Sequence, residues 1–69
     1  MVNKQEAQLT AREQQVVILI CKNLKYREIA EQLGLGYETV KTYANRIRTK
    51  LGLTSKVAVV LWAQQKGLI

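Results

Sequence analysis

The segment from Ile29 to Val40 constrains the fold of this chain more than any other part of the sequence. Its pattern is Ile29-Ala30-x-x-Leu33-Gly34-Leu35-x-x-x-x-Val40. Gly34 can adopt the left-handed backbone conformation that a sharp turn after a helix requires. Ala30 is small enough to let a second helix cross close to the first. The pattern is typical of a helix-turn-helix, although an ordinary helical hairpin in another small bundle has the same local features.

A first helix is expected ahead of this turn. Thr10 and Glu13 have the spacing of a capping box, in which each side chain bonds the backbone amide of the other residue. The helix then extends to about Lys22 with a broad apolar face. Residues 1–8 lack hydrophobic periodicity and are expected to form a flexible N-terminal arm. A second helix begins near Tyr26 and leads into the turn.

The third helix is expected over residues 37–51, and the fourth starts after Thr54 or Ser55 and ends before Gly67. Apolar residues of the third helix recur on one face, and they are Val40, Ala44, Ile47 and Leu51. Residues 9–69 are therefore predicted to form one all-α domain, a four-helix bundle that contains the helix-turn-helix and no wing.

Positive charge is concentrated in the second half of the chain. Residues 1–38 contain five basic and five acidic side chains, whereas residues 39–69 contain six basic and no acidic ones. A surface that carries only positive charge attracts polyanions such as nucleic acids. Basic side chains also serve simply as solvated surface, so the charge alone leaves both interpretations open.

The outward face of the third helix distinguishes between these interpretations. If its apolar residues face inward, the outward side carries Lys41, Thr42, Asn45 and either Arg48 or Thr49. A lysine can donate to guanine, an asparagine can bond adenine twice, and a threonine methyl group can contact thymine. Beyond Glu38 the helix has no acidic residue, whereas a merely solvated helix usually includes acidic residues for internal ion pairs. The pattern favours a helix that contacts base pairs in duplex DNA.

The residue types needed for most catalytic and metal sites are scarce. The chain has one cysteine, Cys21, and no histidine. An internal disulfide, a Cys and His zinc site and a Cys–His nucleophile pair are therefore excluded. We expect no enzyme activity, no metal and no cofactor. The sequence has no signal peptide and no apolar run of about 18 residues, which favours a cytoplasmic protein.

Five motifs together resemble the LuxR-type DNA-binding domain, also called the GerE or NarL type. They are Leu9-Thr10-Ala11-Arg12-Glu13, Glu28-Ile29-Ala30, Thr39-Val40-Lys41-Thr42, Lys50-Leu51-Gly52-Leu53 and Lys66-Gly67-Leu68-Ile69. The resemblance covers residues 9–69. It implies a transcription regulator of the bacterial nucleoid or the plastid stroma. Its third helix would read DNA, and its fourth helix would form a homodimer on a near-palindromic site.

The resemblance also implies individual DNA contacts. Base contacts fall at Lys41, Thr42 and Asn45, in agreement with the outward face. Contacts to phosphates are expected near Tyr26, Arg27, Tyr37, Thr39 and Lys50, and the charges of Arg46 and Lys56 extend this edge. Lys25 stands where the family commonly has a serine that caps the second helix, so the start of this helix is expected to be less well capped.

The fourth helix contains seven consecutive apolar residues at positions 57–63. One apolar face of this helix can pack on the core. The opposite apolar face would be exposed to solvent unless a second surface packs against it. That second face is expected to include Val59, Trp62, Ala63 and the stem of Lys66. The resemblance implies that a second copy of the chain covers it, and a missing domain of the same chain is the alternative.

Two other functions remain open from the sequence. A promoter-reading module of a sigma factor has a similar helix-turn-helix, binds as a monomer and works with RNA polymerase. The apolar fourth helix argues against it. A basic protein-interaction module would instead dock on an acidic partner through Trp62 and its neighbours.

Overall fold

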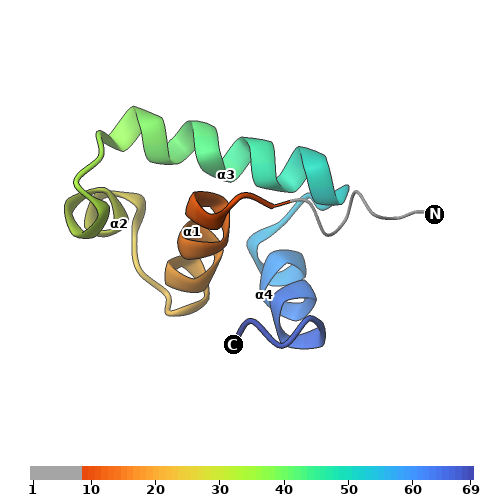
Figure 1. Cartoon of the computed structure of the whole chain (residues 1–69). Coiled ribbons are helices and arrows are strands. Elements are labelled where there is room, and N and C mark those ends of the chain that lie inside the picture. The colour runs from red at the N-terminus through yellow and green to blue at the C-terminus, as the bar shows by residue number, and fades with distance from the viewer. Residues whose placement is uncertain (1–8) are drawn as a thin grey trace.

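The computed structural model describes residues 9–69, which form four helices (Figure 1). The helices are α1 (Ala11–Cys21), α2 (Tyr26–Leu33), α3 (Tyr37–Leu51) and α4 (Lys56–Gln65). The predicted all-α fold is confirmed, and the helices begin and end within a residue or two of the predicted positions. The arm expected over residues 1–8 lies outside the described residues.

Helix α1 is the centre of the packing, because it contacts each of the other three helices. Figure 1 shows α3 lying across the molecule, with α2 near its first turns and α4 near its last turns. Among the described helices, α2 packs mainly on α3 and α1, and α4 packs mainly on α1. This arrangement leaves one long side of α3 without a covering helix.

The core is a single cluster of apolar side chains from all four helices. Its buried residues are Leu9, Val16, Val17, Leu19, Ile20, Ile29, Ala30, Val40, Ala44, Ile47, Val59 and Ala63. The contribution of α3 consists of Val40, Ala44 and Ile47, and Leu51, the fourth residue of the predicted face, is partly buried against the cluster. Burial of these side chains supplies the main driving force for folding, and it fixes which face of α3 points outward.

Each of the four described helices is followed by a pair of residues with the same backbone geometry. The first member has a positive φ between 68° and 75°, and the four are Asn23, Gly34, Gly52 and Gly67. The second member is a leucine whose N–H bonds the carbonyl oxygen five residues earlier, at Leu24, Leu35, Leu53 and Leu68. These leucines are partly buried against the core. The pair thus satisfies the last carbonyl groups of the helix and attaches its end to the core.

The starts of the helices are capped in different ways. In α1 the expected capping box is present, since the hydroxyl of Thr10 accepts from the Glu13 amide and a Glu13 oxygen accepts from the Thr10 amide. Lys25 makes no side-chain cap on α2, as expected. However, a carboxylate oxygen of Glu28 accepts from the Lys25 amide at 2.7 Å, which the sequence analysis missed. In α4 the Ser55 hydroxyl accepts from the amide of residue 58.

The end of α3 gives a test of the helix caps. At Gly52, φ is +69° and no atom lies within 4 Å of an added Cβ, so Gly52→Ala is strained only by its backbone. We expect this variant to lower the free energy of unfolding by about 1 kcal/mol in urea denaturation. Gly52→Asn is the matched control, because asparagine tolerates a positive φ, as Asn23 does after α1. An equal loss in both variants would contradict this explanation.

Candidate nucleic-acid interface

The uncovered side of α3 carries the three residues that were expected to contact bases. Lys41, Thr42 and Asn45 are all exposed, on the opposite side of the helix from its buried residues. The Thr42 hydroxyl donates to the carbonyl oxygen of Glu38 at 3.0 Å, which holds that side chain against the helix. Asn45 presents both a donor and an acceptor to solvent. The three side chains are thus available to a macromolecule that approaches this side.

Lys41 has two weak partners on its own helix. Its Nζ lies 3.8 Å from a carboxylate oxygen of Glu38 and 5.9 Å from the centre of the Tyr37 ring. The Lys41 and Glu38 side chains are 47% and 82% exposed. Exposed ion pairs of this kind contribute little free energy. Lys41 can therefore exchange these contacts for a base edge at small cost.

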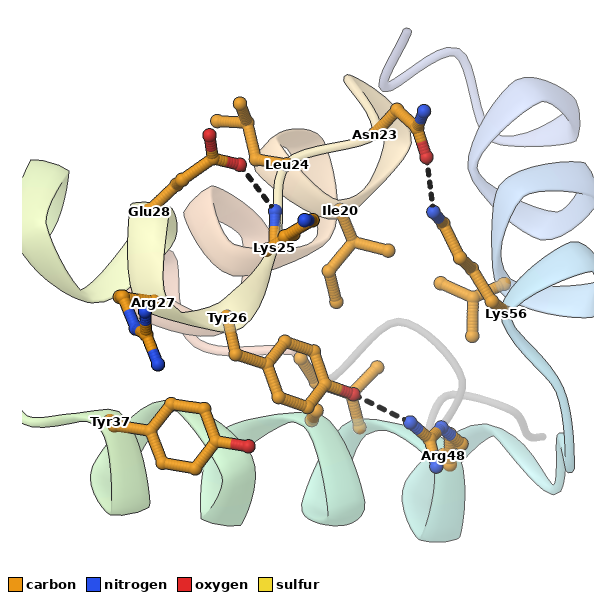
Figure 2. Close-up of a pocket in the computed structure, with 13 residues that line it drawn as sticks. Ile20, Asn23, Leu24, Lys25, Tyr26, Arg27, Glu28, Tyr37, Arg48 and Lys56 are labelled. Carbon is orange, nitrogen blue, oxygen red and sulfur yellow. Dashed lines mark hydrogen bonds between the residues drawn. The ribbon is translucent and has the colours of Figure 1, made fainter.

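One flank of α3 faces the start of α2. The rings of Tyr26 and Tyr37 are tilted by 53° with centroids 6.4 Å apart. In Figure 2 the Tyr26 side chain points along α3 to Arg48, whose Nη2 donates to the Tyr26 hydroxyl at 2.7 Å. Arg27 and Tyr37 are exposed beside this pair. The flank brings together the expected phosphate contacts of α2 and the start of α3.

The opposite flank of α3 is attached to α1 by an ion pair. Nζ of Lys50 lies 2.8 Å from Oε1 of Glu13, and the Glu13 side chain is only 3% exposed. The same Glu13 oxygen accepts from the Thr10 amide at 2.9 Å. Burial raises the pKa of Glu13, but the hydrogen bonds of Lys50 and Thr10 outweigh burial, so the pKa lies below its ordinary value. Lys50 was expected to contact a DNA phosphate, and in the folded domain it is paired with Glu13.

The remaining expected phosphate contacts are divided between two places. Thr39 and Arg46 are exposed on α3. Lys56 lies at the start of α4, where its Nζ donates to the side-chain oxygen of Asn23 (Figure 2). This bond connects the turn between α1 and α2 to α4, and no local spacing in the sequence indicates it.

A groove runs between the start of α2, α3 and the start of α4 (Figure 2). Its apolar lining includes Ile20, Leu24, Ala44, Ile47 and Val59. Its charged lining consists of the cations Lys25, Arg27, Arg48 and Lys56 and the single carboxylate Glu28. The groove is therefore basic and lies directly beside the outward face of α3.

Part of the partner surface that was expected on α4 is buried in the core. Val59 is 2% exposed and Ala63 is 0% exposed, because both pack into the core of this chain. They leave no surface for a partner, and the expectation that they face one is wrong. Trp62 is half-buried and Lys66 is exposed. The apolar surface instead belongs to Val57 and Leu61, which are 68% and 53% exposed.

Metal clusters and membrane spans are two other kinds of feature that the described residues could carry. Within residues 9–69, no three side chains of His, Cys, Asp or Glu gather closely enough to hold a metal ion. No helix in this range combines the length and apolar character needed to cross a membrane. The exposed side of α3 and the adjacent basic groove form the candidate site.

Comparison with known proteins gives a consistent result. Residues 7–63 match the family described as bacterial regulatory proteins, luxR family. The chain is 41% identical over 66 residues to the transcriptional regulatory protein YdfI of Bacillus subtilis, covering 96% of this chain and 31% of that protein. It is also 41% identical over 61 residues to the oxygen regulatory protein NreC of Staphylococcus aureus, covering 88% and 28%. The chain thus spans less than a third of these relatives.

The buried ion pair predicts a defined dependence on pH. Since the folded-state pKa of Glu13 lies below its ordinary value of 4.5, its stabilising contribution is present above that pH and is lost as the pH falls through the lower value. Glu13→Gln should reduce the free energy of unfolding by about 2 kcal/mol at pH 7. The difference in the free energy of unfolding between this variant and the native chain should become smaller below pH 4.5. Urea denaturation from pH 7 to pH 2 measures both, with Glu31→Gln as the exposed control.

Proposed function

Because the chain belongs to the luxR family of bacterial regulatory proteins, a family of helix-turn-helix DNA-binding domains, we propose that it binds specific DNA sequences as a homodimer. The domain is a non-catalytic part of a transcription regulator. Helix α3 enters the major groove, and Lys41, Thr42 and Asn45 contact the base edges. The observation that carries this proposal is the exposed side of α3, which joins these three side chains while its opposite side is buried.

Phosphate contacts on both flanks of α3 hold the domain on the duplex. Arg27, Tyr37, Thr39 and Arg46 are exposed, and Tyr26 is partly buried and lines the groove together with Arg27 and Tyr37. Lys50 and Lys56 add positive charge at the edges, although each also has a partner within the chain. Such contacts position the protein without reading sequence, so affinity falls steeply as salt increases.

The dimer forms through the exposed apolar side of α4. Val57 and Leu61 are four residues apart and lie one above the other on the helix. Their exposure supports a second copy as the cover, together with the half-buried Trp62. A two-fold arrangement presents two α3 helices to half-sites about one DNA turn apart. The regulator acts at the bacterial nucleoid, in the cytoplasm, where a promoter-bound domain can also meet RNA polymerase.

Selection from a random duplex pool, with sequencing of the bound fraction, tests base reading. The native domain should enrich a near-palindromic motif with two half-sites. Asn45→Ala should relax the preference at its base pair, at a cost of about 1–3 kcal/mol for the preferred sequence. Arg46→Gln is the matched comparison, since loss of a phosphate contact should weaken all sequences equally. The proposal fails if a folded native domain enriches no sequence, or if Asn45→Ala weakens all sequences alike.

A charge on the exposed side of α4 tests the dimer. Leu61→Glu should abolish the concentration-dependent dimer in sedimentation and lower affinity for the two-half-site duplex far more than for a single half-site. Its fold should persist because Leu61 is 53% exposed. Gln15→Glu adds the same charge to an exposed position on α1 and should change neither result. A native chain that remains monomeric and binds an asymmetric site would contradict the dimer.

A further inference from the structure

Arg48 is a basic residue of α3 to which the family resemblance assigns no DNA contact. It lies three residues after Asn45 and seven after Lys41, which places it on the same flank of the helix as both. Its side chain extends toward α2 and lines the basic groove (Figure 2). Within residues 9–69, no carboxylate lies within ion-pair distance of Arg48, in contrast to Lys50 and its partner Glu13. The charge of Arg48 is therefore not neutralised inside the domain.

The hydrogen bond between Arg48 and Tyr26 has a definite direction. The guanidinium donates and the phenol oxygen accepts, at 2.7 Å. The phenol proton remains to be donated, and the guanidinium has five N–H donors, of which this bond uses one. Because its oxygen accepts a bond from a cation, the Tyr26 hydroxyl becomes a stronger donor. Both groups therefore present donors to an anion that approaches the flank.

The surroundings hold this pair in place. The Tyr26 ring packs at 6.4 Å from the Tyr37 ring, which restricts its rotation. The groove around it has four cations and one carboxylate, Glu28, and that carboxylate is bonded to the Lys25 amide. The apolar residues that line the groove lower the local dielectric constant and so strengthen contacts between charged groups. A single anionic group at this point would meet positive charge on several sides.

We propose that Tyr26 and Arg48 together bind one phosphate group of the DNA backbone, beside the bases contacted by α3. Arg48 donates to the phosphate oxygens, and Tyr26 both positions Arg48 and donates its own proton. The inference rests on the proposed DNA-binding function and adds Arg48 as a contact. On this flank of α3 the phosphate is bound by the Tyr26–Arg48 pair. On the opposite flank, Lys50 is bonded to Glu13.

Substitution of Arg48 tests the proposed contact. Binding of the native domain and of Arg48→Gln is measured by fluorescence anisotropy between about 50 and 200 mM salt. The duplexes are the selected sequence and a scrambled one. Arg48→Gln should weaken both duplexes about tenfold and lower the slope of log affinity against log salt by about 1. Lys22→Gln, at an exposed position outside the groove, removes the same charge and should retain the native slope.

Tyr26→Phe tests whether the two residues act as a pair. The variant keeps the ring contact with Tyr37 and removes the hydroxyl, so it should weaken both duplexes several-fold. In the Arg48→Gln background the further loss should be smaller than in the native background, because the two side chains serve one phosphate. Melting curves establish that each variant is folded.

The outcomes separate this inference from the function on which it rests. A folded Arg48→Gln variant with native affinity overturns the inference and leaves the function intact. The same holds for a variant whose affinity falls while its salt slope is unchanged. A native domain that shows no preference for the selected duplex overturns both.

Discussion

A single buried carboxylate joins the end of α3 to the start of α1. Glu13 is almost fully removed from solvent, and it bonds both the Thr10 amide at the start of α1 and the Lys50 ammonium near the end of α3. A buried charge without a partner is strongly destabilising, so the two helix ends are held together. Burial of Val40, Ala44 and Ile47 turns the side of α3 that carries Asn45 outward, and the ion pair fastens the end of that helix to α1.

Local chemistry explains why much of the fold was predictable. The capping spacing of Thr10 and Glu13 and the glycines after the helices determine where helices begin and end within a few residues. The four-and-three spacing of Val40, Ala44 and Ile47 is sufficient to identify the buried face of α3. The outward placement of Lys41, Thr42 and Asn45 follows directly, because burying one side of a helix exposes the other.

Contacts between distant residues could not be predicted in the same way. Lys50 and Arg48 are both basic residues of α3, yet one binds the carboxylate of Glu13 and the other a tyrosine hydroxyl. Which partner each residue has depends on which helix packs against that flank of α3. The spacing of residues along the sequence does not indicate this. Helix α4 shows the same limit. Its apolar run has no polar position to mark the outer side, so Val59 was assigned to the surface although it lies in the core.

The repeated pair of a left-handed residue and a leucine has a consequence for how the domain folds. Each bond that closes a helix end joins residues five positions apart, as between Leu53 and Arg48. Helix and terminator can therefore form together from neighbouring residues, before distant parts of the chain meet. Proteins dominated by such short-range contacts cross small entropic barriers and fold in about microseconds to milliseconds. A fast-folding domain leaves its apolar residues, including those of α4, exposed to aggregation for only a short time after synthesis.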